Sequence, residues 1–242
     1  MDTSKSFGLD GIGNALLRAT ATSIAKPLAM IFNASLQNGQ FPSAWKAAVV
    51  VPVPKGKGDR CVVSSYRPIS LTISLSKVLE HLAHQQILMY LLDNDLICKQ
   101  QFGFLPGRST LLELASIVHQ MHTTIADSPD RFIRAVLLDI SKAFDKVWHA
   151  GLLSKLSGMG FEPKWFSSYL SGRSICTRVD GQMSSFALTS AGVPQGIVLG
   201  PLLFLCYVND LPAAANVSPY MFADDTALVV AQQRSQLYAS TC

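Results

Sequence analysis

The segment Met221–Val230 reads MFADDTALVV and places two adjacent carboxylates, Asp224 and Asp225, inside an apolar run. The short apolar stretches at 219–223 and 226–231 predict a β-hairpin with the acidic pair at its turn. Two neighbouring carboxylates repel each other, and their charged forms are costly beside apolar residues unless a cation neutralises them. Taken alone, such a pair is most often a solvated turn, so the surrounding sequence has to decide between a surface turn and a metal site.

A third carboxylate ends another apolar run. Residues 132–138 (FIRAVLL) predict a buried strand, and Asp139 follows directly. If this strand lies beside the hairpin in one sheet, the three carboxylates converge at one end of it. Carboxylate oxygens suit Mg²⁺, which proteins hold through one or two carboxylates together with waters and substrate phosphates. Two such ions about 3.5–4 Å apart can activate an attacking hydroxyl and stabilise a leaving oxygen.

The remaining pattern predicts an α+β fold with antiparallel pairing. Helices are predicted at 14–37, 74–92, 111–125, 148–159 and 163–171, a strand at 46–53, and a hairpin at 173–180 and 184–190. Pro27 is predicted to open a second helix, and Asn38-Gly39 to end it. Thr110 and Glu113 are predicted to form a capping box. Within 74–92 the predicted apolar side consists of Leu75, Val78, Leu79, Leu82, Gln86 and Met89.

Composition excludes several classes of protein. Of the 242 residues, 49% are hydrophobic and 15% are charged, which excludes an intrinsically disordered chain. The longest apolar stretch, Ile197 to Val208, is too short for a membrane span, which needs about 20 residues, and no signal-peptide core follows the N-terminus. We therefore expect an intracellular protein without membrane contact, in the nucleus or the cytoplasm.

Metal sites built from cysteine or histidine are not indicated. The five cysteines are an odd number without a Cys-x-x-Cys pair, which argues against disulfides or structural zinc. Two histidine pairs, His81/His84 and His119/His122, have helical spacing, but surface or half-buried histidines are the favoured interpretation. The net charge of +4 is concentrated in a basic stretch that suits phosphate contacts. Its residues are Lys46, Lys55, Lys57, Arg60 and Arg67.

Several motifs, in a fixed order, resemble those of reverse transcriptases. Residues 220–225 (YMFADD) resemble the aspartate box, 136–145 (VLLDISKAFD) the first palm motif, and 190–201 (SAGVPQGIVLGP) the second. Residues 66–71 (YRPISL) and 101–110 (QFGFLPGRST) resemble the fingers motifs of non-LTR, LINE-type retrotransposons. Similar elements also carry segments like 8–12 (GLDGI) and 41–46 (FPSAWK) just before the fingers. Five ordered motifs are far more specific than any one of them, so the acidic pair is interpreted as part of a metal site.

The resemblance implies a right-hand polymerase fold with fingers and palm. It implies a helical segment at 1–45 before the fingers, fingers at 46–130, and a palm at 131–242 built on an antiparallel sheet backed by helices. The chain stops just past the aspartate hairpin, so the thumb is expected to be absent. The implied activity is that of an RNA-directed DNA polymerase, a nucleotidyltransferase that acts on an RNA template, a DNA primer and a dNTP.

The resemblance also implies the residues of the site. Asp139, Asp224 and Asp225 are expected to be catalytic and to bind two Mg²⁺ ions, for which Mn²⁺ is a possible substitute. The expected nucleotide-binding residues are Lys55 and Arg67 over the triphosphate, Phe144 beneath the sugar, and Gln195 and Gly196 beside the nucleotide and the minor groove. An aromatic ring at Phe144 leaves no room for a 2′-hydroxyl, which favours deoxynucleotides.

Two alternatives stay open at this point. Asp145 follows Phe144 directly, and a shift of one residue would offer an acid to a 2′-hydroxyl, as in an RNA-dependent RNA polymerase. Ile197 stands where these proteins usually carry serine, and Leu105 where they carry a basic residue. Together with the missing thumb, these departures are compatible with a catalytically inactive retroelement remnant that binds RNA.

Overall fold

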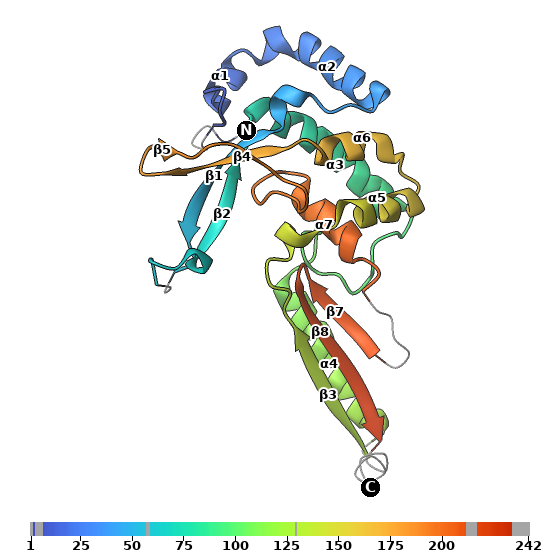
Figure 1. The fold of residues 1–242 in the computed structure, drawn as a ribbon. Helices are drawn as coiled ribbons and strands as arrows, with labels where there is room; N and C mark the ends of the chain where they lie inside the picture. The colour runs from blue at the N-terminus through green and yellow to red at the C-terminus, as the bar shows by residue number, and fades with distance from the viewer. Residues whose placement is uncertain (1, 3–6, 57–58, 129, 212–216, 234–242) are drawn as a thin grey trace. The chain divides into compact units, whose positions relative to one another are not determined.

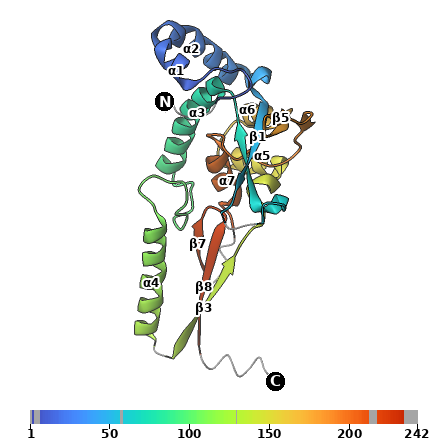
Figure 2. The ribbon, with the colours of Figure 1, turned by 90° about the vertical axis from the view of Figure 1, so that its left-hand side faces the viewer.

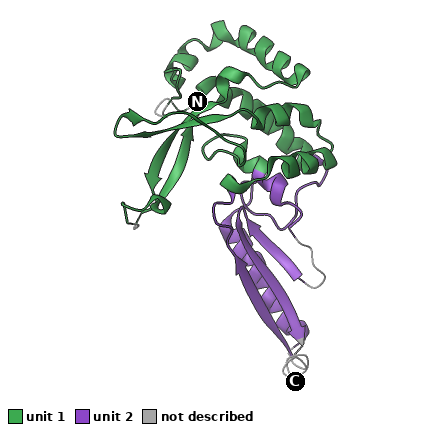
Figure 3. Ribbon diagram, viewed as in Figure 1, with its two compact units in different colours: residues 1–91, 144–203 green, residues 92–143, 204–242 purple. Residues whose placement is uncertain are grey.

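The computed structural model describes residues 2, 7–56, 59–128, 130–211 and 217–233, and it mixes helices with strands (Figures 1 and 2). Its contacts divide the chain into two compact units, each made of two segments (Figure 3). Unit 1 contains residues 1–91 and 144–203, and unit 2 contains 92–143 and 204–242. This is a division by contacts rather than by function, so the boundary between fingers and palm at residue 130 stays a prediction.

Helices surround an aromatic core in unit 1. Its helices are α1 (Asn14–Ala19), α2 (Ala21–Asn38), α3 (Ser74–Asp93, which runs into unit 2), α5 (His149–Gly158) and α6 (Pro163–Leu170), with short 3-10 turns η1 (Ser43–Trp45), η2 (Val63–Ser65) and η3 (Phe144–Lys146). The turn after α2 packs on α6, because the Phe41 ring meets Trp165 at 5.7 Å and Tyr169 at 4.9 Å between centroids. The Trp165 indole N–H donates to Ser35 Oγ of α2 at 3.0 Å, which leaves this buried donor satisfied.

The sheet of unit 1 has five strands in mixed orientation. They are β1 (Ala47–Pro54), β2 (Tyr66–Leu71), β4 (Ser174–Val179), β5 (Gln182–Met183) and β6 (Ala187–Leu188). The path runs β2-β1-β4-β5, and β6 also pairs with β4. β1 and β2 are antiparallel, whereas β1 and β4 are parallel. The predicted hairpin turn at Asp180-Gly181 is confirmed, because Val179 pairs with Gln182 and both turn residues have positive φ.

Two helix predictions in unit 1 are wrong in detail. The predicted helix at 14–37 is interrupted at Thr20, between α1 and α2, where the Thr20 hydroxyl donates to the Leu16 carbonyl of α1. Pro27 does not begin the second helix but lies inside α2. Gly39 ends α2 with φ 63°, as predicted. The predicted helix at 74–92 is confirmed, but its buried side differs, since Leu82 and Met89 are exposed. The buried residues of α3 are Ser74, Ser76, Leu79, Glu80, Ala83, Ile87 and Leu91.

Unit 2 is a three-stranded antiparallel sheet with a helix along it. The strands are β3 (Arg131–Leu138), β7 (Val217–Phe222) and β8 (Asp225–Gln233), in the order β3-β8-β7. Helix α4 (Thr110–Asp127) runs alongside them (Figure 2). The core between sheet and helix consists of Tyr220, Ala227 and Val229 with Phe102, Ile117, Met121 and Ile133. The predicted hairpin around Asp224-Asp225 is confirmed. Helix α7 (Gly200–Val208) joins the two units along the chain.

The prediction that residues 132–138 are buried is wrong. They form β3, but none of its residues is buried, and Leu137 is 80% exposed. β3 lies at the edge of its sheet, and among the described residues of unit 2 the helix that packs on the sheet is α4. A fully apolar strand is buried only where both of its faces are covered. Within the described ranges, no helix is long and apolar enough to cross a membrane.

Candidate active site

The three aspartates lie at one end of the sheet in unit 2. β3 and β8 are antiparallel, and their last pair is Leu138 with Thr226. The next position of this register, beyond the last pair, belongs to Asp139, which follows β3 directly, and to Asp225, the first residue of β8. The expectation that the strand before Asp139 lies beside the hairpin of Asp224 and Asp225 is therefore confirmed.

Asp224 belongs to the turn between β7 and β8. The last pair of that hairpin is Phe222 with Asp225, so Ala223 and Asp224 form a two-residue turn. Ala223 has φ 59°, in the left-handed region that costs a residue with a side chain roughly 1 kcal/mol or more. Asp224 is half-buried, whereas Asp139 and Asp225 are exposed. The turn is thus a strained element that presents a carboxylate at its tip.

The aspartates have the right ligand chemistry for a divalent cation, but their side chains do not gather around one point in this structure. Among the described residues, no three carboxylate, imidazole or thiol groups gather closely enough to hold a metal ion. Carboxylates without a cation between them repel each other. Their donor set is all oxygen, which is the kind of ligand that Mg²⁺ and Mn²⁺ prefer.

A fourth carboxylate faces the site. Glu113, in the first turn of α4, has its pKa raised by burial and by the charge of Asp225. The predicted capping box is wrong, because Ser109 is the N-cap and its hydroxyl accepts from Leu112 N at 3.3 Å. Glu113 is thereby free of a capping role and adds to the negative charge beside the aspartates.

A Glu113→Gln variant is expected to be more stable than the parent at neutral pH. Because the folded-state pKa of Glu113 lies above its unfolded value, ionisation disfavours folding at pH values above about 4.5, and this penalty vanishes at lower pH. The gain in melting temperature should therefore appear at pH 7 and disappear below pH of about 4. Thermal unfolding followed by circular dichroism from pH 4 to 8 without divalent ions measures it. A parent more stable than the variant at pH 7 would contradict the repulsion.

Two of the predicted nucleotide-binding residues lie on the β1–β2 hairpin of unit 1. Arg67 pairs with Val53 in the ladder, and Lys55 follows the end of β1, where its N–H donates to the Ser65 carbonyl at 2.8 Å. Both side chains are exposed. Two cations near the end of one hairpin suit an anionic ligand, and arginine adds bidentate geometry.

Backbone hydrogen bonds join the other three predicted nucleotide-binding residues to one region of unit 1. Val193 N donates to the Phe144 carbonyl at 2.9 Å, and Ser70 N of β2 donates to the Gln195 carbonyl at 2.7 Å. Gly196 has φ 102°, and a Cβ there would lie 2.8 Å from the Ser70 carbonyl oxygen. Only glycine allows this approach. The loop that carries Gln195 and Gly196 is therefore fixed between β2 and η3.

Sequence reasoning missed Glu80, a fully buried carboxylate on α3. Its Oε2 accepts from Val198 N at 2.9 Å, Leu199 N at 3.3 Å and the Tyr169 hydroxyl at 3.1 Å, and its Oε1 accepts from Ser76 Oγ at 2.7 Å. Burial and the Glu80 charge raise the pKa of Tyr169 well above its usual value, which keeps the proton on the phenol. Glu80 thus anchors the residues that follow Gly196, at the start of α7.

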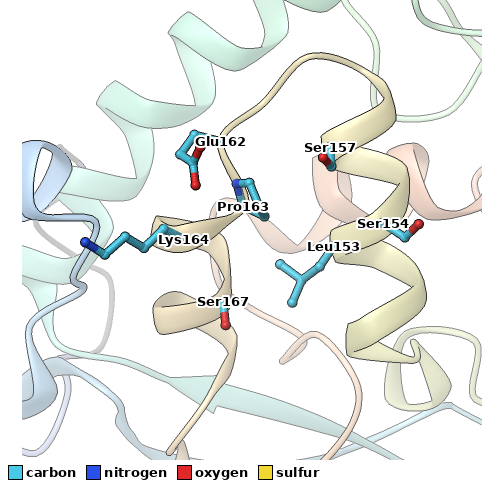
Figure 4. Close-up of a pocket in the computed structure, with 7 residues that line it drawn as sticks. All are labelled: Leu153, Ser154, Ser157, Glu162, Pro163, Lys164 and Ser167. Carbon is cyan, nitrogen blue, oxygen red and sulfur yellow. The ribbon is translucent and has the colours of Figure 1, made fainter.

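A surface pocket in unit 1 contains none of the predicted site residues (Figure 4). It has a volume of about 510 Å³ and lies between α5 and α6. Its lining residues are Leu153, Ser154, Ser157, Glu162, Pro163, Lys164 and Ser167. This lining includes no histidine or cysteine, so it does not offer the serine–histidine pair of a typical activated nucleophile. The pocket is therefore not the site that the sequence motifs predict.

The chain is similar to proteins of known family. A family model described as "Reverse transcriptase (RNA-dependent DNA polymerase)" matches residues 53–241. A "Probable RNA-directed DNA polymerase from transposon BS" of Drosophila melanogaster is 36% identical over 245 residues, which cover 98% of this chain and 26% of that protein. The "RNA-directed DNA polymerase from mobile element jockey" of the same species is 35% identical over 98% of this chain and 27% of its own length. The chain thus spans about a quarter of the length of these relatives.

A solved structure shows a similar fold. The apo telomerase of Candida tropicalis, truncated from its C-terminal domain, matches 90% of this chain and 50% of that chain with a TM-score of 0.57. Sequence identity is only 13%, so this likeness concerns the fold alone. It is consistent with the predicted α+β polymerase architecture of fingers and palm.

Proposed function

Since the chain belongs to the reverse transcriptase family, we propose that it copies RNA into DNA as the polymerase part of a longer retrotransposon protein. The substrates are a DNA primer paired to an RNA template and the four dNTPs. The observation that carries the proposal is the register of unit 2, which places Asp139, at the end of β3, and Asp225, at the start of β8, at the same end of the sheet, with Asp224 in the adjoining turn. Three carboxylates at one end of a sheet repel each other, and bound cations would neutralise that repulsion.

In this proposal Asp139, Asp224 and Asp225 hold two Mg²⁺ ions, for which Mn²⁺ can substitute. When bound, such ions supply activation of the primer 3′-hydroxyl and neutralise the charge that develops on the leaving pyrophosphate. The three carboxylates fix where that charge is neutralised, because they are attached to the ends of two paired strands and a two-residue turn. A site built on strands holds its geometry more closely than one built on loops.

The residues of unit 1 bind the nucleotide in this proposal. Lys55 and Arg67, exposed on the β1–β2 hairpin, pair with the triphosphate, whose negative charge increases on the leaving group. The half-buried Phe144 lies beneath the sugar and excludes a 2′-hydroxyl. Gln195 and Gly196 contact the nucleotide and the minor groove from a loop that β2 fixes by a hydrogen bond.

Primer extension by the purified chain tests this function. The expected result is incorporation of labelled dNTPs on an RNA template with a DNA primer, dependent on Mg²⁺ and lost in an Asp224→Ala/Asp225→Ala double variant. NTPs offered in place of dNTPs are expected to be incorporated poorly. Equal incorporation by the double variant would contradict the assigned site, and a preference for NTPs would indicate an RNA polymerase instead.

RNA binding by the same protein distinguishes an active polymerase from an inactive remnant that binds RNA. A folded chain that binds RNA in a salt-dependent way but extends no primer would be an RNA-binding remnant, because phosphate contacts alone weaken steeply with salt. Fluorescence anisotropy of a labelled template between 50 and 300 mM salt, roughly the range over which such contacts are lost, measures it. That result would overturn the polymerase proposal for this chain.

A further inference from the structure

A segment without an assigned role holds the turn of the aspartate hairpin. Residues 100–103, between α3 and α4, run beside β7 as an isolated parallel bridge between Gln101 and Met221. Met221 N donates to the Gln100 carbonyl at 2.9 Å, and Phe102 N donates to the Met221 carbonyl at 2.6 Å. All of these residues belong to unit 2. The segment is thus fixed to the strand that leads into the acidic pair.

The side chain of Gln101 reaches the turn itself. It is only 2% exposed, and its Oε1 accepts from Ala223 N at 3.0 Å and from Gly103 N at 2.8 Å. Ala223 is the residue with positive φ, so this hydrogen bond holds the turn in a conformation that its own side chain disfavours. The position of Asp224, the next residue, depends on that conformation.

Backbone packing makes the arrangement specific. A Cβ on Gly103 would lie 2.4 Å from Ala223 N, so the two backbones approach too closely for any side chain at this position. Arg108 closes the loop from the other side, because its Nη1 donates to the Gln101 and Lys99 carbonyls and its guanidinium lies 5.5 Å from the Phe102 ring centroid. These contacts bind Arg108 to the segment that holds the turn.

We propose that Gln101 is a positioning residue that fixes the Ala223-Asp224 turn for metal binding by the aspartates. The inference rests on the proposed function, since it gives the turn a metal to hold. Residues that orient metal ligands by hydrogen bonds typically change metal affinity or activity about 10- to 100-fold when they are replaced. Gln101 acts through the backbone of the turn and does not touch the metal.

The test compares Gln101→Leu, Gln101→Glu and the matched control Gln100→Leu with the parent chain. Gln100 is the exposed neighbour of the same type, and its Oε1 accepts from the Cys98 thiol at 3.3 Å rather than from the turn. Amide hydrogen exchange in the absence of metal measures how firmly Gln101 holds the turn. In Gln101→Leu, exchange of the Ala223 amide should accelerate about tenfold or more, while the Phe102 amide keeps its protection. Equal protection of Ala223 in parent and variant would overturn the clamp.

Mn²⁺ binding, followed by water-proton relaxation, measures the consequence. Gln101→Leu should bind Mn²⁺ about tenfold more weakly and need a correspondingly higher Mg²⁺ concentration for primer extension. Gln101→Glu keeps an acceptor for Ala223 N and should restore Mn²⁺ affinity to within about threefold of the parent. Faster exchange at Ala223 with unchanged Mn²⁺ affinity would overturn the positioning role.

Mn²⁺ binding and primer extension by the parent chain show whether this inference or the proposed function fails. If the parent binds Mn²⁺ but extends no primer, the polymerase proposal fails while the comparison of affinities still decides the role of Gln101. If the parent binds no Mn²⁺ at millimolar concentration, the metal site and the role of Gln101 toward it are both overturned. The exchange measurement then still reports whether Gln101 holds the turn.

Discussion

An Asp139→Asn variant is expected to lose primer extension by about a thousandfold or more while its fold and its affinity for RNA remain. Asparagine has the shape of aspartate and keeps one oxygen ligand, but it removes the negative charge at the end of β3, on the same end of the sheet as Asp225. Loss of one preorganised electrostatic contact at a reacting centre costs about 10²–10³-fold in rate, and loss of a metal ligand adds weaker cation binding. The measurement is the initial rate of dNTP incorporation at saturating Mg²⁺.

The matched control is Asp130→Asn. Asp130 is an exposed aspartate just before Arg131, at the opposite end of the same strand, so its replacement changes the net charge equally without touching the site. The control should extend primers at the parental rate. Without divalent ions, Asp139→Asn should melt no lower than the parent, because it relieves repulsion with Asp225. Incorporation within tenfold of the parent would remove Asp139 from the catalytic site.

Local patterns predicted the aspartate hairpin and β3 because each depends on residues close together in sequence. A run such as MFADDTALVV carries its own alternation and turn, and its strands pair with each other. β2 was missed because Pro68 lies within the run, and a proline argues against a strand. In the structure β2 is an edge strand, where proline is tolerated. The parallel pair of β1 and β4 joins segments more than 100 residues apart, and no local pattern indicates it.

The candidate site shows the same limit. Asp139, Asp224 and Asp225 were predicted from carboxylates beside apolar runs together with ordered motifs that resemble those of reverse transcriptases, and the structure places all three at one end of a sheet. Gln101 and Glu80 were missed because their roles depend on partners from distant segments. One signal was present for Glu80, which lies four residues after Ser76 and three before Ala83 on the buried side of α3. A glutamate on that stripe is buried and requires donors.

Replacing Glu80 by leucine is expected to lower the free energy of unfolding by on the order of 4 kcal/mol. The change keeps the volume of the side chain but leaves the Tyr169 hydroxyl and the N–H groups of Val198 and Leu199 without their acceptor. Each buried donor that loses its partner costs about 1–3 kcal/mol. Urea unfolding followed by circular dichroism measures the loss. The control is Gln85→Leu, which replaces an exposed residue of the same helix. Its free energy of unfolding should stay within about 0.5 kcal/mol of the parent value.

Glu80→Gln distinguishes the hydrogen bonds from the charge. Its amide oxygen can take the place of Oε2 before the three donors, and its NH₂ group can donate to Ser76 Oγ, which also accepts hydrogen bonds. The expected loss is therefore about 1–2 kcal/mol, clearly less than in the leucine variant. Because Val198 and Leu199 lie two and three residues after Gly196, the loop that carries Gln195 should loosen more in the leucine variant than in Glu80→Gln, which hydrogen exchange at the Leu199 amide measures. If both variants lost less than about 0.5 kcal/mol, water would have to satisfy these donors equally well, and Glu80 would not anchor the loop.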